Sequence, residues 1–155
     1  MHTHAKRRGF TLIEILLVIG IIAILAGVVL IAINPTRQFQ EARDSQRVSN
    51  VNAILNAIGQ YIADHKGDAP SAIASSTSPR HISNAGADIC KDLVPIYLPS
   101  FPTDPSSSHK GTALTETDCT SPYDTNYSVG RDSNGRITIS ATAETPGAPV
   151  ISSMR

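Results

Sequence analysis

One segment limits what this chain can fold into more than any other: residues 15–33 (ILLVIGIIAILAGVVLIAI) contain only apolar side chains and glycine. A helix of these 19 residues would extend about 28 Å, close to the roughly 30 Å of hydrocarbon in a bilayer. Because lipid offers no partners to backbone polar groups, a single span there must be helical. The sequence therefore predicts a transmembrane helix near the N-terminus, in which Gly20 and Gly27 leave notches for another helix.

The charges around this segment predict its orientation. Lys6, Arg7 and Arg8 precede it without an acidic neighbour, so the positive-inside tendency places the N-terminus in the cytoplasm and everything after Ile33 outside. Residues 10–155 then hold 10 basic groups (13 minus these 3) against 13 acidic groups. This balance argues against a strongly cationic face, and we expect no nucleic-acid partner.

The rest of the chain is poor in apolar residues. Residues 10–33 contain 20 hydrophobic residues, which leaves 43 for the other 131 positions. The residues outside 10–33 can therefore build only a thin core. This composition argues against a compact cytosolic enzyme. No pairing of nucleophile and base, phosphate-binding glycine loop or dinucleotide motif is present, and we expect no enzymatic activity.

Glu14 is the one charge next to the apolar segment, and it demands an explanation. An acid in the middle of a membrane costs about 2.5–3.5 kcal/mol on insertion scales. One interpretation places Glu14 at the lipid headgroups, where it stays hydrated. The other is that a cation meets the carboxylate inside an assembly.

Three explanations compete for the N-terminal region. A secretory signal peptide would need a better cleavage site than residues 25–27 provide, and would rarely hold a glutamate in its apolar part. A plain single-span anchor leaves the hexapeptide 9–14 (GFTLIE) without a role. The string 6–14 (KRRGFTLIE), followed at once by an apolar helix, resembles the N-terminus of type IV pilins and type II secretion pseudopilins.

The resemblance carries specific expectations for three residues. It implies that a prepilin peptidase cuts between Gly9 and Phe10 on the cytoplasmic side of the membrane, and that the new N-terminal Phe10 is N-methylated. It also implies that Glu14 is needed for assembly. The freed amine of Phe10 in one subunit would then neutralise Glu14 of the next, since a missing partner at low dielectric costs several kcal/mol. Such a head-to-tail contact does not close on itself and builds a helical filament.

A second helix follows the apolar one. Pro35 predicts a kink or a melted turn, since it lacks the N–H that would bond the Ile31 carbonyl. The pattern then resumes as an apolar stripe at helical spacing, with the Asp44/Arg47 pair on the polar face and Gly67 as the stop. The stripe consists of Val48, Val51, Ile54, Leu55, Ile58 and Ile62.

The remaining residues predict loops and a small sheet. Residues 68–86 and 99–111 are expected to be loops, and residues 93–98 a short edge strand or extended piece. Residues 93–99 with 101–105 also resemble the segment between helix and sheet in major pseudopilins and their pilin relatives. Alternating apolar residues at 127–129 and 137–143, around the turn 132–135, predict a hairpin packed on the stripe. The tail from Thr145 could add an edge strand at 150–151 or remain loose.

Cys90 and Cys119 are the only cysteines. In a core-poor region expected outside the cytoplasm, two cysteines favour a disulfide over free thiols. The bond would tie the 90–119 loop to the sheet, much as a C-terminal disulfide loop does in many pilins. No cofactor is expected. Four loop acids, Asp104, Asp118, Asp124 and Asp132, could gather around Ca²⁺, as happens in some major pseudopilins, although Asp132 also suits an ordinary turn.

Together these observations predict an α+β, type IV pilin-like fold. The expected parts are a leader (1–9), a transmembrane and assembly helix (10–34), an amphipathic helix half (35–66) and a disulfide-bonded head of loops and antiparallel strands (67–155). The expected function is that of a pilin, a single-pass inner-membrane prepilin that polymerises into an extracellular pilus, or fimbrium, of the kind used in adhesion and motility. The expected partners are other pilin subunits, the prepilin peptidase, the inner-membrane assembly machinery and, before assembly, the membrane.

Three alternatives to a pilus subunit remain open. Within the family, a type II secretion pseudopilin or a minor pilin of DNA uptake would have the same core fold. From another class, the chain could be a single-span, membrane-anchored binding module whose region 90–155 recognises a ligand without polymerising.

Overall fold

The computed structural model describes residues 9–73 and 76–155, which form two compact units that divide between Gln38 and Phe39. The predicted leader lies outside the described residues apart from Gly9. The first unit consists essentially of helix α1, and the second contains a sheet, most of helix α2 and the connecting loops. The elements in chain order are α1 (Leu12–Ala32), α2 (Pro35–Asp64), β1 (Ser76–Ser83), α3 (Cys90–Leu93), the 3-10 turn η1 (Asp118–Thr120), β2 (Asp124–Arg131), β3 (Ile137–Ala141) and β4 (Ile151–Met154).

Helix α1 is an isolated apolar helix. None of its 21 residues, all of which are described, is buried in the structure. By length and composition it is the one helix of the described residues that could cross a membrane. This finding fits a membrane anchor near the N-terminus, because an apolar surface that the subunit itself leaves open must be covered by lipid or by other helices.

The two helices are separated at Pro35. Helix α1 ends at Ala32, and Ile33 has an extended backbone. The side-chain oxygen of Asn34 accepts a hydrogen bond from the backbone N–H of Arg37 at 3.3 Å, which caps the new helix. Pro35 is then the first residue of α2, where its missing N–H costs nothing.

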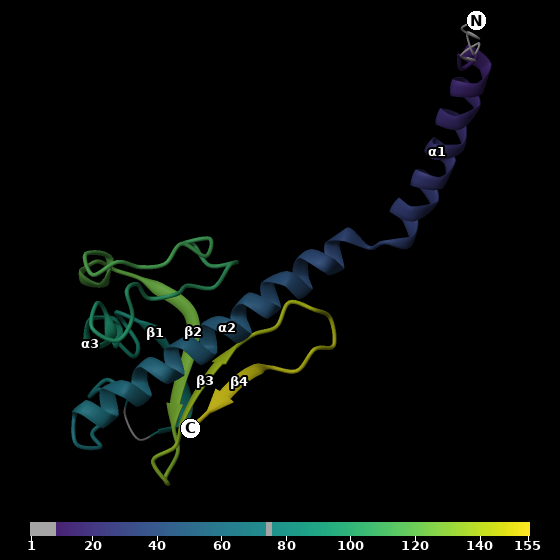
Figure 1. Ribbon diagram of the computed structural model, residues 1–155. Helices are drawn as coiled ribbons and strands as arrows, with labels where there is room; N and C mark the ends of the chain where they lie inside the picture. Colours follow the sequence, from purple (N-terminus) through teal and green to yellow (C-terminus); the bar gives the residue numbers. More distant parts are fainter. Residues whose placement is uncertain (1–8, 74–75) are drawn as a thin grey trace, which may run out of the picture. The chain divides into compact units, whose positions relative to one another are not determined.

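The second unit is built around a four-stranded antiparallel sheet. Its strand order is β1-β2-β3-β4, and α2 lies across one face (Figure 1). The predicted hairpin is confirmed: β2 pairs with β3, and Val129 lies opposite Ile139 in the core. The turn between them is closed by a bond from the Gly135 N–H to the Asp132 carbonyl at 3.0 Å. The α+β class and the antiparallel sheet predicted from the sequence are therefore confirmed.

The apolar stripe of α2 is confirmed only in its middle. The residues from Val51 to Ile58 that belong to it are buried against the sheet, whereas Ile62 is half-buried. Val48 is 46% exposed, so its assignment to the core was wrong. The buried position at that end of the stripe belongs to Arg47, which is 1% exposed, and its assignment to a solvated polar face was also wrong. An arginine can be buried here because acidic groups from distant loops surround it.

Two assignments, a loop and a short strand, differ from the structure. Residues 76–83, expected within a loop, form β1, whose irregular pairing with β2 places Arg80 opposite Val129. Pro79 is tolerated because β1 is an edge strand. Residues 93–98 form no strand: the backbone N–H groups of Tyr97 and Leu98 both bond the Leu93 carbonyl, at 2.8 and 3.0 Å. Because backbone N–H and C=O groups in α3 and this turn bond to each other, they are not available to pair with another strand.

The head core includes a disulfide between Cys90 and Cys119, as predicted. Both residues are buried, and their Cα atoms are 5.5 Å apart. The bond joins α3 to η1, two short elements that contribute little core of their own. Under the chain-entropy model, closing a loop of this length stabilises the fold by about 3–4 kcal/mol. The head thus has its own core and its own covalent link.

Candidate functional site

The first candidate site is the start of α1. Thr11 is the N-cap residue: its hydroxyl oxygen accepts a hydrogen bond from the Glu14 N–H at 3.3 Å, and its carbonyl accepts from the same N–H at 3.1 Å. Thr11 followed by Glu14 three residues later is the sequence pattern of a capping box. This capping role of Thr11 was not among the predictions, although the spacing of Thr11 and Glu14 indicates it. Glu14 therefore lies in the first turn of α1, where a carboxylate interacts favourably with the helix dipole.

The residues before Thr11 are not part of the helix. Gly9 and Phe10 have no regular secondary structure, and the Phe10 side chain is 78% exposed. Gly9, Phe10, Thr11 and Glu14 line one open hollow. The three predicted residues, Gly9, Phe10 and Glu14, thus lie within six positions of the chain and line the same hollow. The Gly9–Phe10 peptide bond lies in irregular backbone, so a peptidase could reach it without unwinding α1.

The second site is a buried charge cluster around Arg47 of α2. Its guanidinium donates to both carboxylate oxygens of Asp104, at 2.6 and 2.9 Å, and to Asp44 at 2.7 Å. It also donates to the hydroxyl of Ser106 at 2.9 Å and to Glu144. The two bonds to Asp104 are a bidentate, charge-assisted pair, the strongest kind of side-chain hydrogen bond. The cluster connects α2 to the loops at 104–106 and 144–145.

A further set of bonds fixes the segment before β4. Arg43 donates to Glu144 from two nitrogens, at 2.8 and 2.5 Å. The carboxylate of Asp44 accepts from the backbone N–H groups of Glu144 and Thr145, both at 2.9 Å, and from the Thr145 hydroxyl at 2.6 Å. The sequence showed the pairing of Asp44 with Arg47 but gave no signal for Asp104, which lies 57 positions further along the chain. We interpret the cluster as structural.

Each of the four calcium candidates has hydrogen-bond partners of its own. Asp104 pairs with Arg47, and Asp118 accepts from the backbone and hydroxyl of Thr115, at 2.8 and 2.7 Å. Asp124 accepts from the Asn126 N–H at 2.9 Å, and Asp132 binds Arg136. In the part of the chain that the structure describes, no three His, Cys, Asp or Glu residues form a group that could hold a metal ion. The structure therefore does not bring these aspartates together.

The carboxyl groups of the cluster have lowered pKa values. For Glu144, the hydrogen bond from Arg43 is the main cause of the lowered pKa. Burial by itself would raise the pKa values of Asp44 and Asp104. For Asp44, hydrogen bonds from Thr145, Glu144 and Arg47 outweigh burial and hold the pKa well below its usual range. For Asp104, hydrogen bonds from Arg47 and Ser106 do the same. All three groups therefore stabilise the fold in their ionised form.

The head should lose stability in acid. A carboxyl group whose pKa is lower in the folded state stabilises the fold fully above its unfolded pKa, near 4, and loses that contribution as the pH falls through the folded pKa. We expect the free energy of unfolding to drop by about 2 kcal/mol or more between pH 6 and pH 3. Urea unfolding of the purified chain at each pH measures this drop. Glu144→Gln should reduce it and Glu116→Gln, at an exposed position, should not. Equal stability at both pH values would contradict the prediction.

Comparison with known proteins adds one finding to this geometry. Residues 4–30 match the family model described as the prokaryotic N-terminal methylation motif. The match covers Gly9, Phe10, Thr11, Glu14 and most of α1. No curated protein and no solved structure gave a significant match.

Proposed function

We propose, because this chain carries the N-terminal signature of type IV pilins and pseudopilins, that it is the precursor of a structural subunit that polymerises into an extracellular filament. The observation that carries this proposal is the motif match together with the position of Glu14, in the first turn of an apolar helix that has no buried residue. The proposed partners are the prepilin peptidase, the assembly machinery of the inner membrane and other subunits of the same kind.

The proposed sequence of events begins with cleavage. The peptidase hydrolyses the Gly9–Phe10 bond, which releases the basic leader and leaves a free amine on Phe10. Methyl transfer to this amine, from a methyl-donor cofactor of the processing enzyme, keeps its positive charge. The loss of Lys6, Arg7 and Arg8 removes three charges that would resist extraction of the helix from the membrane.

Assembly then follows from charge pairing. Between Leu12 and Ala32, Glu14 is the only charged side chain. In a bundle of such helices it needs a cation, and the amine of Phe10 in a neighbouring subunit can supply one. The offset of four positions between the two groups gives a head-to-tail contact with an axial step. The same apolar helix therefore serves as a membrane anchor before assembly and as the filament core afterwards.

The alternatives within the family differ in the role of the filament. A pseudopilin of a secretion system and a minor pilin of DNA uptake would be processed and assembled in the same way. A pilus subunit is our preferred proposal, and adhesion and motility are the activities that such a pilus would support.

Intact-mass measurement on protein extracted from membranes tests the proposal. We expect a mass that lacks residues 1–9 and is increased by one methyl group. Gly9→Val is a matched control, since an added Cβ at Gly9 meets no atom within 4 Å and should disturb recognition rather than folding. This variant should keep its leader. A wild-type chain that keeps residues 1–9 in cells with an active prepilin peptidase would favour a plain membrane anchor instead.

A further inference from the structure

Strand β4 leaves one edge of the head sheet open. It is the last strand in the order β1-β2-β3-β4, so no described strand pairs with its outer side. The register next to β3 shows which groups face outward. Ile137 and Arg155 exchange two backbone hydrogen bonds, at 2.8 and 3.0 Å. Because bonded and non-bonded pairs alternate in antiparallel sheets, Ser153 and Ile151 also bond to β3. The N–H and C=O groups of Val150, Ser152 and Met154 therefore point away from the sheet.

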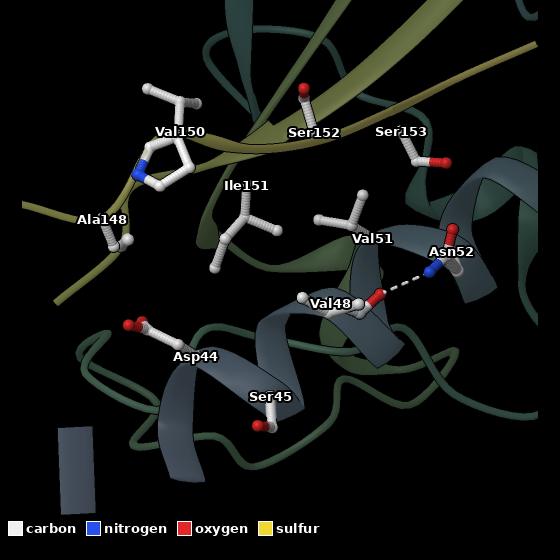
Figure 2. A pocket seen from close by; sticks show the side chains of 12 residues that line it. Asp44, Ser45, Val48, Val51, Asn52, Ala148, Val150, Ile151, Ser152 and Ser153 are labelled. Carbon is white, nitrogen blue, oxygen red and sulfur yellow. Dashed lines mark hydrogen bonds between the residues drawn. The ribbon is translucent and has the colours of Figure 1, made fainter. Parts of the chain in front are cut away.

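A groove runs beside this edge. It has a volume of about 420 Å³ and lies between β4 and the exposed side of α2. Figure 2 shows Ile151 of β4 and Val48 of α2 extending into the space between the two elements. On the opposite side from Ile151, Met154 of β4 and Val150, which directly precedes β4, are 55% and 65% exposed. Both faces of the strand thus offer apolar contacts to another strand added at the edge.

Charge distinguishes this edge from the other one. Residues 148–154 (APVISSM) contain no charged side chain and no proline within β4. The edge strand β1 contains Pro79, Arg80 and His81, which oppose strand addition. Two copies of β1 would also place like charges near each other, whereas two copies of β4 would not. Two copies of β4 can therefore lie next to each other without charge repulsion.

We propose that two copies of this chain pair antiparallel through β4, with Ser152 of one copy opposite Ser152 of the other. The outward backbone groups match in this register and can form six hydrogen bonds. Val150 then lies opposite Met154 of the second copy on one face, twice by symmetry, and such apolar cross-strand pairs are favourable. On the other face, Ile151 lies opposite Ser153 of the second copy, beside the groove at Val48. The result is a continuous eight-stranded sheet.

This contact differs from filament assembly. A two-fold contact is isologous, whereas neighbours in a polar filament are related head to tail. The β4 contact therefore links heads that belong to different filaments, or heads that have not assembled. It does not use Phe10 or Glu14, and it can be tested in a background in which assembly is blocked by Glu14→Ala.

Cysteine cross-linking of the full chain in detergent tests the register. One tagged copy carries Val150→Cys and the other Met154→Cys, with the native disulfide intact in both. The proposed pairing places these two positions about 5.5 Å apart, within disulfide range, and two copies of position 150 about 13 Å apart. Oxidation should give mixed dimers in yields on the order of tenfold above those of either variant alone. Equal yields, or no dimer in the mixture, would overturn the proposal.

Charged substitutions of Ser152, which lies on the proposed symmetry axis, provide a second test. Ser152→Lys and Ser152→Glu each place two like charges opposite each other and should weaken pairing about fivefold. A mixture of the two variants should restore it, because the charges then attract. Circular dichroism should show that both variants remain folded, since the Ser152 side chain is exposed. Failure of the mixture to restore pairing would show that Ser152 does not face itself.

Discussion

Glu14→Ala and Glu14→Gln should each abolish filaments while leaving processing and membrane insertion intact. Either change leaves the amine of Phe10 without a partner in the apolar core of the proposed filament. An uncompensated buried charge costs about 3–5 kcal/mol, which lowers the subunit association constant by more than about 100-fold. Glutamine keeps the size and hydrogen-bonding capacity of the side chain and removes only its charge. Electron microscopy and the mass of sheared filaments measure assembly, and intact mass measures processing.

Thr11→Ala is the matched control for Glu14. This change removes the hydroxyl that accepts the Glu14 N–H but leaves the carboxylate in place. Loss of a helix cap costs about 1 kcal/mol, so assembly should fall by roughly tenfold at most. If Thr11→Ala were as severe as Glu14→Gln, capping of α1 rather than charge pairing would explain the effect. Normal filaments from Glu14→Gln would contradict the proposed mechanism.

Arg47→Ala should strongly destabilise the unit formed by residues 39–155. It leaves Asp104 buried without its cation and takes one partner each from Asp44 and Glu144. Removing one member of a buried ion cluster costs about 3–5 kcal/mol, which is a large part of the stability of a small domain. Urea unfolding followed by circular dichroism measures the loss. Arg47→Lys should recover little of it, since an ammonium cannot form the bidentate bond to Asp104.

Arg43→Ala provides the comparison for Arg47→Ala. Arg43 is 38% exposed at its side chain and binds only Glu144 among the described acids. Surface ion pairs contribute about 0–1 kcal/mol, so this variant should be nearly as stable as the wild type. The double variant Arg47→Met with Asp104→Leu should be more stable than Arg47→Ala, because it leaves no unpaired carboxylate at position 104. If Arg43→Ala and Arg47→Ala lowered the free energy of unfolding equally, burial of the arginine would not determine how much its ion pairs stabilise the fold.

The elements that depend on short stretches of sequence were predicted correctly. The alternation at Tyr127, Val129, Ile137 and Ile139 gave the hairpin, because side chains on one face of a strand repeat every second residue. The break at Pro35 follows from the chemistry of a single residue. The pairing of Cys90 with Cys119 needed no pattern, since the chain has no other cysteines.

Long-range contacts account for what the sequence did not predict. Strand β1 has a loop-like composition and becomes a strand only because β2, more than 40 positions later, offers an edge. Arg47 has the character of a surface residue and is buried only because Asp104 and Glu144 arrive from two loops. At the N-terminus, the candidate residues Gly9, Phe10 and Glu14 lie within six positions of the chain, so a local motif was enough to propose them. Only the capping role of Thr11 was missed.

The burial pattern of α1 also bears on how the chain could be re-engineered. None of the residues of α1 is buried, and the core, the disulfide and the ion cluster are all formed by residues of the second unit. Under the proposed function, the signals for processing and for membrane anchoring both lie in residues 1–34. These residues, grafted onto an unrelated exported domain, should then direct the processing and anchoring of that domain.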